Sequence, residues 1–76
     1  YDESIKLNSE NETAWFNKGS ALNKLERYEE AIRCYDESIR IKPNYESAWT
    51  NKGLLLNKLE RYEEAIGCYD ESIRIN

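Results

Sequence analysis

The sequence predicts an all-α fold in which antiparallel helix–turn–helix units stack side by side as a solenoid. One stretch of sequence occurs twice, 34 residues apart. The two copies, Glu12–Lys42 and Glu46–Asn76, align over 31 positions and differ at six of them. Apolar residues within each copy recur at steps of three and four, the spacing of a helical face. The opening Tyr1–Asn8 also repeats the closing Tyr69–Asn76 with few changes. Such self-similarity is typical of arrays in which each unit buries its apolar face against the next.

The repeat divides the chain into parts of one array covering residues 1–76. Residues 1–11 are interpreted as the end of a preceding repeat, containing its second helix only. Residues 12–45 form a full repeat and residues 46–76 a nearly full one. The sequence starts at Tyr1 and contains no Met, so we expect it to be a piece of a longer chain.

The first helix of the unit is expected over about Glu12–Leu25. The preceding Ser9–Glu12 has the Ser-x-x-Glu form of a capping box. More than half of the circumference of this helix carries residues expected to pack, so we expect contacts on two sides. These residues are Ala14, Trp15, Lys18, Gly19, Ala21, Leu22 and Leu25. A glycine inside a helix costs ~1 kcal/mol relative to Ala, so Gly19, repeated as Gly53, predicts a contact too close for a Cβ.

The second helix of the unit carries one clear stripe and is expected to end at Pro43. The stripe consists of Tyr28, Ala31, Ile32, Tyr35, Ser38, Ile39 and Lys42. On the other side, Glu29 with Arg33 and Asp36 with Arg40 are acid-before-base pairs four residues apart. We expect these charges to form a solvated face.

The overall charge argues against two classes of partner. Fifteen acidic and eleven basic residues give a net charge of −4 and a pI near 4.8. Binding to a nucleic-acid backbone needs clustered Lys and Arg, so no nucleic-acid partner is expected. No apolar run approaches the ~20 residues that cross a bilayer, so no membrane partner is expected either.

The residue types that catalysis and metal binding require are scarce. The chain has no His, and we find no phosphate-cradling glycine loop and no base beside a nucleophile. We therefore expect no enzyme, no metal and no cofactor. Cys34 and Cys68 occupy the same place in the two copies, which favours reduced thiols in a cytoplasmic protein over a disulfide framework.

With this period and these residues the chain resembles the tetratricopeptide repeat family. The matching signature positions are Trp15 and Trp49, Gly19 and Gly53, Leu22 and Leu56, Ala31 and Ala65, Tyr35 and Tyr69, and Pro43. The resemblance covers the whole chain. It implies a right-handed superhelical solenoid whose first helices line an inner, concave wall where extended peptides bind.

Four positions, with their counterparts 34 residues later, depart from the family's pattern. Lys18 replaces a usual Leu, so we expect its stem to pack and its ammonium to reach water. Ser38 replaces a small Ala and places a hydroxyl in or near the helix contact. Glu26 stands where the turn often carries Gly. Arg27 stands where the second helix often has an Asp cap, and losing such a cap costs ~1 kcal/mol.

The candidate binding surface is a stripe of the first helices that packing does not require. At 100° per residue, Ser20 and Asn17 fall within about 100° of Phe16, whereas Trp15 and Leu22 lie on another side. We call this set the variable stripe: Thr13, Phe16, Asn17, Ser20, Asn23 and Lys24, then Ser47, Thr50, Asn51, Leu54, Asn57 and Lys58. Three of the six differences between the copies fall on it, at 13/47, 16/50 and 20/54.

Roles on the variable stripe follow partly from the resemblance. Asn17 and Asn51 match the family's groove asparagine, whose amide offers donors and an acceptor to a peptide backbone. Phe16 with Leu54 is a candidate apolar pocket, and the two lysines favour an acidic partner. Alternatively, Phe16 packs neighbouring units and the asparagines satisfy local backbone groups. The family's carboxylate-clamp pattern is not matched, because residues such as Phe16 and Ser20 stand at its positions.

Two functions compete. The first is a non-catalytic protein–protein interaction scaffold that binds a peptide or partner segment on the concave face. The alternative is a structural module that stacks head to tail through uncapped ends. Its exposed end would carry Tyr62, Ile66, Tyr69 and Ile73 and receive the Tyr1 end of another molecule.

Overall fold

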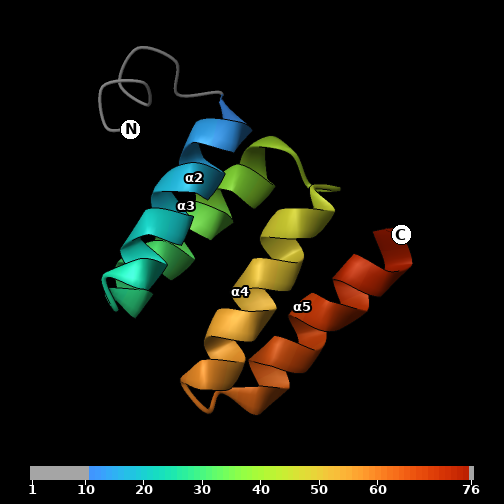
Figure 1. The fold of residues 1–76 in the computed structure, drawn as a ribbon. Coiled ribbons are helices and arrows are strands. Elements are labelled where there is room, and N and C mark those ends of the chain that lie inside the picture. Colours follow the sequence, from blue (N-terminus) through green and yellow to red (C-terminus); the bar gives the residue numbers. More distant parts are fainter. Residues whose placement is uncertain (1–10, 76) are drawn as a thin grey trace.

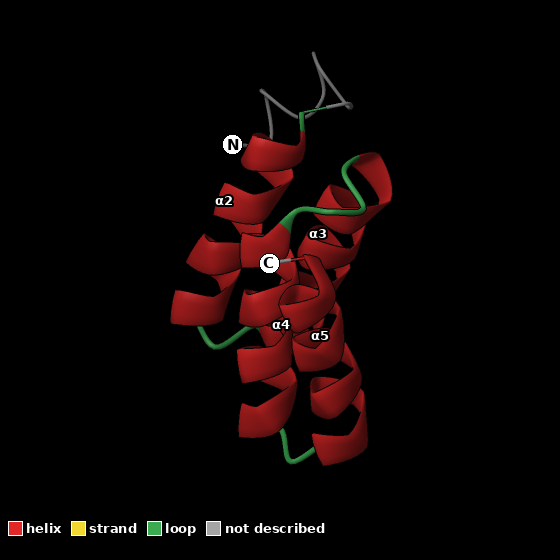
Figure 2. Ribbon diagram, turned by 90° about the vertical axis from the view of Figure 1, so that its right-hand side faces the viewer, coloured by secondary structure: helices red, strands yellow, loops and turns green. Residues whose placement is uncertain are grey.

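The computed structural model describes residues 11–75, and within that range the chain forms four α-helices. They are α2 (Glu12–Lys24), α3 (Tyr28–Ile41), α4 (Glu46–Lys58) and α5 (Tyr62–Ile75). Figure 1 shows them side by side, each running opposite to the one before. In the side view, α2 and α4 lie toward one side of the array, and α3 and α5 toward the other (Figure 2). The predicted all-α array of helical hairpins is confirmed.

The start of α2 corrects the predicted cap. The Asn11 side chain accepts a hydrogen bond from the Ala14 amide at 2.9 Å, so Asn11 is the N-cap and Glu12 the first helical residue. A capping box needs Glu12 at the third helical position, and the helix starts two residues too late for that. Ser9 itself lies outside the described residues.

The turn inside each hairpin ends its first helix in a Schellman arrangement. The Glu26 amide bonds to the Asn23 carbonyl and the Arg27 amide to the Leu22 carbonyl, both at 2.9 Å. This arrangement places Glu26 at φ 62° and its counterpart Glu60 at φ 63°, the left-handed region that favours glycine. Arg27 then starts α3 without a side-chain cap, because arginine has no acceptor to offer.

The contact within each hairpin explains the two mid-helix glycines. A Cβ placed on Gly19 would lie 2.8 Å from Cε1 of Tyr35, and one on Gly53 would lie 2.7 Å from Cε1 of Tyr69. Tyr35 is 1% exposed and has no space to withdraw. The predicted close approach is therefore confirmed: the aromatic ring of the second helix lies directly on the backbone of the first.

The hydroxyls of the second helices also face this contact. Ser38 donates a hydrogen bond to the Glu12 carbonyl at 2.9 Å, and Ser72 lies 2.7 Å from the Thr50 hydroxyl. Both serines are buried. Because buried hydroxyls need partners, these bonds tie each second helix to its own first helix.

The two hairpins join where α3 packs against α4. A single apolar cluster crosses from one hairpin to the other. Its buried members are Leu22, Ala31, Ile32, Cys34, Tyr35, Leu55, Leu56, Ala65 and Cys68. The Trp49 indole also donates to the Pro43 carbonyl at 2.8 Å, which fixes the connection between α3 and α4. The hairpins are therefore packed as one body.

Charges at this junction do not lie as the sequence suggested. Glu29 and Asp36 were expected to pair within their own helix, four residues ahead. Instead Asp36 contacts Lys52 at 2.5 Å and Glu29 contacts Arg61 at 3.4 Å, both across the unit boundary. The expected solvated face is thus partly an interface. Lys52 thus packs its stem at the junction, and its ammonium pairs with Asp36 of α3, a carboxylate that is itself half exposed.

Two expectations about the exposure of large side chains are also wrong. Leu25 was expected to pack, but it is 65% exposed, whereas its counterpart Leu59 packs against the cluster beside α3. Tyr69 was placed on the exposed end, but its ring is half-buried on Gly53. The packing therefore decides in both cases: Leu59 lies against the apolar cluster, and the Tyr69 ring lies on the backbone of α4.

Two further observations concern residues 11–75 as a whole. No helix in this range combines the length and the apolar character that spanning a bilayer demands. The range holds both cysteines, each a buried thiol outside any disulfide.

Candidate functional site

The variable stripe lies on α2 and α4, and all twelve of its residues reach the surface. Seven are exposed and five are half-buried. The exposed ones are Thr13, Asn17, Lys24, Ser47, Leu54, Asn57 and Lys58; the half-buried ones are Phe16, Ser20, Asn23, Thr50 and Asn51. The stripe therefore has the accessibility that a binding surface requires, and its role stays a prediction.

Phe16 lies at the junction of the two hairpins. Its ring is 5.7 Å from that of Tyr35 and 5.3 Å from that of Tyr45, both tilted by about 45°. Tilted aromatic pairs at this spacing are favourable. Phe16 thus packs α2 against the start of α4, while Leu54 remains 54% exposed. That the two form an apolar pocket for a ligand stays a prediction.

Two polar members of the stripe form hydrogen bonds to side chains of the second helices. The Ser20 hydroxyl lies 3.3 Å from the Tyr35 hydroxyl, and the Thr50 hydroxyl bonds to Ser72. Burial raises the pKa of Tyr35, with Ser20 acting in the opposite sense. The phenol therefore stays protonated and available as a donor. Ser20 and Thr50 consequently have fixed positions, whereas Asn17 is exposed on its helix.

Asn23 differs from the other amides of the stripe. Within the described chain its Oδ1 atom is buried and has no hydrogen-bond partner. A buried acceptor left in this state costs about 1–3 kcal/mol. Its counterpart Asn57 is exposed. The sequence alone did not distinguish the two, because the same residue type stands at both positions and only the packed structure shows that they differ in burial.

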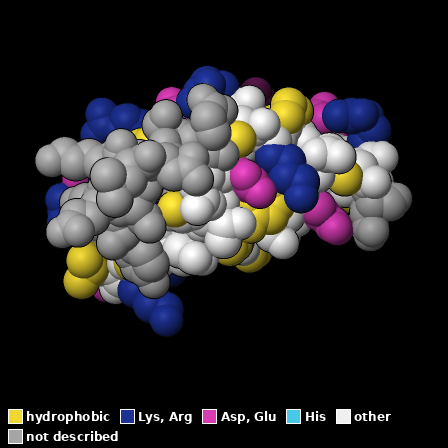
Figure 3. All heavy atoms as spheres, turned by 90° about the horizontal axis from the view of Figure 1, so that it is seen from above, with side chains coloured by type: hydrophobic (Ala, Val, Ile, Leu, Met, Phe, Trp, Pro, Cys, Tyr) yellow, Lys and Arg dark blue, Asp and Glu magenta, His cyan; other side chains and the backbone are white. Residues whose placement is uncertain are grey.

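The lysines of the stripe differ in their surroundings. Lys58 places Nζ 5.5 Å from the ring of Tyr28 on α3, an exposed cation–π contact of about 0.5–1 kcal/mol. Lys24 is exposed on α2. Seen from above, basic and acidic side chains of the described residues lie interspersed (Figure 3). The lysines thus provide local positive charge on a chain whose net charge is negative.

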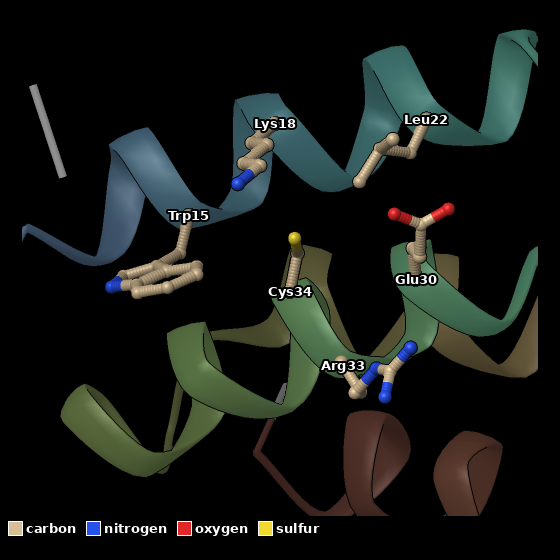
Figure 4. A pocket seen from close by; sticks show the side chains of 6 residues that line it. All are labelled: Trp15, Lys18, Leu22, Glu30, Arg33 and Cys34. Atoms are coloured by element: carbon tan, nitrogen blue, oxygen red, sulfur yellow. The ribbon is translucent and has the colours of Figure 1, made fainter. Parts of the chain in front are cut away.

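A depression between α2 and α3 was missed in the sequence. It has a volume of about 250 Å³, and Figure 4 shows the side chains that line it. They are Trp15, Lys18, Leu22, Glu30, Arg33 and Cys34. Lys18 also lies 5.8 Å from the Trp15 ring.

The second hairpin shows what such a surface contacts. There the counterpart of Lys18 is Lys52, which bonds to Asp36 of α3. Burial raises the pKa of the Cys68 thiol, while the charge of Lys52 lowers it and that of Asp36 raises it further. The counterpart of the depression thus receives the helix of the preceding unit. Shifting the sequence by 34 residues shows that the depression and the surface around Lys52 share most of their residues.

The chemistry of these residues is that of binding. The Cys68 thiol is kept protonated, which is the unreactive form. Within residues 11–75, no group of three or more His, Cys, Asp and Glu gathers in a metal-binding arrangement. The described side chains offer amides, hydroxyls, ammonium groups and apolar surface.

Comparison with known proteins gives one family and a consistent fold. The model of the family described as "Tetratricopeptide repeat" matches residues 13–45 and again residues 47–76. No curated protein sequence matches the chain.

Solved structures share the fold at low identity. A crystal structure of MamA has a TM-score of 0.95 and 23% identity, covering 97% of this chain and 43% of that one. The second TPR of Spaghetti (RPAP3), bound to HSP90 peptide SRMEEVD, has a TM-score of 0.94 and 22% identity, covering 100% and 70%. YrrB, described as a TPR protein with an unusual peptide-binding site, has a TM-score of 0.92 and 21% identity, covering 99% and 39%. The chain thus spans less than half the length of MamA and YrrB.

Proposed function

This chain belongs to the tetratricopeptide repeat family, and from that premise we propose that it is a protein-interaction scaffold that binds an extended peptide segment along α2 and α4. Members of this family are generally non-catalytic interaction modules, and the proposal includes no catalytic step. The observation that carries it is the accessibility of the whole variable stripe above a repeated packing layer. The concave shape implied by the family is part of the proposal.

The similar structures support a peptide as the partner. The RPAP3 repeat domain is described as bound to a peptide of HSP90, and YrrB as having a peptide-binding site. Both share this fold along nearly the whole chain. A surface of stacked helices suits an extended ligand, because its contacts are spread over successive units.

The side chains of the stripe favour an acidic ligand held by its backbone. Asn17 and Asn51 stand 34 residues apart on α2 and α4, so each offers an amide donor and acceptor from its own unit. Lys24 and Lys58 add positive charge at the C-terminal ends of the same helices. Leu54 adds exposed apolar surface between them. These groups suit a segment with a carboxylate side chain beside an apolar one.

The test begins with peptides selected for binding to the wild-type chain from a random library. We expect the double variant Asn17→Ala/Asn51→Ala to lose about tenfold or more in affinity, since each backbone-directed amide bond contributes ~1 kcal/mol. The matched control is Glu37→Ala/Glu71→Ala on α3 and α5, which removes two polar side chains outside the stripe. Helical circular dichroism verifies that all variants fold. Unchanged affinity in the asparagine variant, or an equal loss in the control, contradicts the proposal.

A second candidate is head-to-tail self-association, favoured by one specific observation. On α5 the side chains of Tyr62, Ile66 and Ile73 are 54%, 57% and 72% exposed. Their counterparts on α3 pack at the unit boundary, where Ile32 is only 7% exposed. A row of large apolar side chains on one helix face is a typical interaction surface. Sedimentation of the chain over a range of concentrations tests it, and a constant monomer mass contradicts it.

The proposal places the chain in the cytoplasm. Its support is the pair of buried thiols, which are outside any disulfide, as expected where the redox poise keeps thiols reduced. Fractionation of cells that produce the parent protein checks the location, and a periplasmic or secreted pool contradicts it.

A further inference from the structure

The variable stripe contains a hydroxyl that a buried tyrosine of the second helix contacts. We propose that Ser20 of α2 donates a hydrogen bond to a carboxylate side chain of the bound peptide, and that Tyr35 of α3 orients the Ser20 hydroxyl for this role. Ser20 is then a ligand contact and Tyr35 a positioning residue. This inference rests on the proposed function and names the part of the stripe that recognises an acidic side chain.

The packing of Tyr35 gives its hydroxyl a fixed place beneath the stripe. Its ring lies on the backbone of α2 at Gly19 and 5.7 Å from the ring of Phe16. The residue is 1% exposed, and its hydroxyl lies 3.3 Å from that of Ser20. Ser20 itself is half-buried and reaches the surface. The two hydroxyls therefore connect the core of the first hairpin to the proposed binding surface.

Burial determines the direction of this hydrogen bond. It raises the pKa of Tyr35, so the phenol keeps its proton at neutral pH. A buried donor without an acceptor is costly, and the Ser20 oxygen is the acceptor that the phenol reaches. A hydroxyl can accept and donate at once. With its oxygen accepting from Tyr35, Ser20 has its own proton left for a ligand.

The length of the bond suits a contact that tightens when a ligand binds. At 3.3 Å it is longer than the usual O–H···O distance of about 2.7–2.8 Å. Hydrogen bonds in a chain polarise and strengthen one another. A ligand oxygen that accepts from Ser20 therefore makes the Ser20 oxygen a better acceptor for the phenol.

The surroundings of Ser20 favour a carboxylate as the ligand group. Lys24 stands four residues later on α2, a spacing that places both side chains on one helix face. Lys24 is exposed. A hydroxyl donor beside an ammonium group suits an anionic oxygen, because hydrogen bonds to charged acceptors are about twice as strong as those between neutral groups.

The second unit carries a different side chain at this place. Leu54 of α4 is the counterpart of Ser20, and it offers no hydroxyl to Tyr69, the counterpart of Tyr35. The two units therefore recognise different groups, a carboxylate at α2 and an apolar side chain at α4. This order gives the bound peptide one direction along the stripe.

The first experiment tests the contact between Ser20 and the carboxylate. The probe is the tightest-binding peptide selected from a random library on the wild-type chain, with each Asp or Glu changed to its amide, one at a time. One amide version should lose about tenfold in affinity. Ser20→Ala should weaken binding of the original peptide by about tenfold and affect that amide version much less. Ser20→Thr keeps the hydroxyl and should retain most of the affinity.

The second experiment isolates the role of Tyr35. Tyr35→Phe keeps the ring on Gly19 and removes only the hydroxyl, so Ser20 can turn its proton to the carbonyl four residues earlier in its own helix. Binding of the original peptide should weaken by about three- to tenfold. The substitution should have no further effect in a Ser20→Ala background. The matched control is Tyr69→Phe, which should leave the affinity unchanged, and helical circular dichroism verifies that all variants fold.

The outcomes separate this inference from the function on which it rests. If Asn17→Ala/Asn51→Ala weakens binding while Ser20→Ala does not, the Ser20 contact is overturned and the function stands. A peptide that tolerates every amide change overturns the carboxylate. A Tyr35→Phe effect that persists without Ser20, or that Tyr69→Phe equals, overturns the positioning role. If the asparagine and serine variants all bind as the wild type does, the function is overturned as well.

Discussion

At the scale of single residues, the fold depends on glycines, which have no Cβ and so let another side chain approach the backbone. Gly19 and Gly53 let tyrosine rings lie on the backbone of the first helices. The sequence predicted this contact because a mid-helix glycine that recurs with the repeat needs a physical reason. The third glycine, Gly67, has open space around its Cβ position.

Substituting alanine at two of these glycines should have opposite effects. Gly19→Ala should destabilise the chain by about 1–2 kcal/mol, because a Cβ overpacks the contact with Tyr35 by more than helix propensity returns. Gly67→Ala is the matched control and should stabilise by up to about 1 kcal/mol. Urea unfolding followed by circular dichroism measures both. Equal effects at the two positions would contradict the packing described here.

The left-handed glutamates give a second prediction. Glu26→Gly and Glu60→Gly should each stabilise the chain by about 1 kcal/mol, since glycine adopts φ near 60° without a Cβ penalty. Glu26→Ala keeps the penalty but removes the carboxylate, and it should change the unfolding free energy little. Thermal unfolding of the three variants is the check. If alanine stabilised as much as glycine, charge rather than backbone strain would be the cause.

At the scale of the helix, surface charges form two kinds of contact. Within helices, pairs form three residues apart, as in Arg27 with Glu30 at 2.6 Å. Between units, Asp36 of α3 pairs with Lys52 of α4, and Glu29 of α3 pairs with Arg61 in the turn before α5. Sequence rules describe pairs within one helix, so the pairs between helices became visible only in the packed structure.

The pairs at the starts of α3 and α5 predict a pH dependence. The hydrogen bond from Arg27 lowers the pKa of Glu30 below its usual 4.5, and the bond from Arg61 does the same for Glu64. A carboxylate with a lower pKa in the folded state stabilises the fold at pH above its unfolded value. This contribution is lost as the pH falls through the folded pKa. The unfolding free energy should therefore decline as the pH drops below about 4.5.

A variant series isolates these two carboxylates from the others. Arg27→Gln/Arg61→Gln removes both pairs, so its unfolding free energy should decline less steeply over the same acidic range. Urea titrations at several pH values measure the slopes. Parallel slopes for the variant and the wild type would assign the acid sensitivity to other groups.

At the scale of the whole molecule, the repeat made the fold predictable and the candidate site only partly so. A period of 34 residues fixed the number and pairing of helices in residues 11–75. The accessibility of the variable stripe followed from helix geometry. For Phe16 the sequence left a ligand-facing and a packing position open, and the packing contact became visible only where Tyr45 approaches it from the loop before α4. The depression at Lys18 required comparison with the buried surface at Lys52.

The central claim is that ligands bind along α2 and α4, and amide chemical-shift mapping by NMR tests it most directly. Titrating the isotope-labelled chain with a selected peptide should shift the amides around Asn17 and Asn51 and leave the outer faces of α3 and α5 unchanged. Shifts concentrated on α3 and α5, with those two asparagines unaffected, would contradict it.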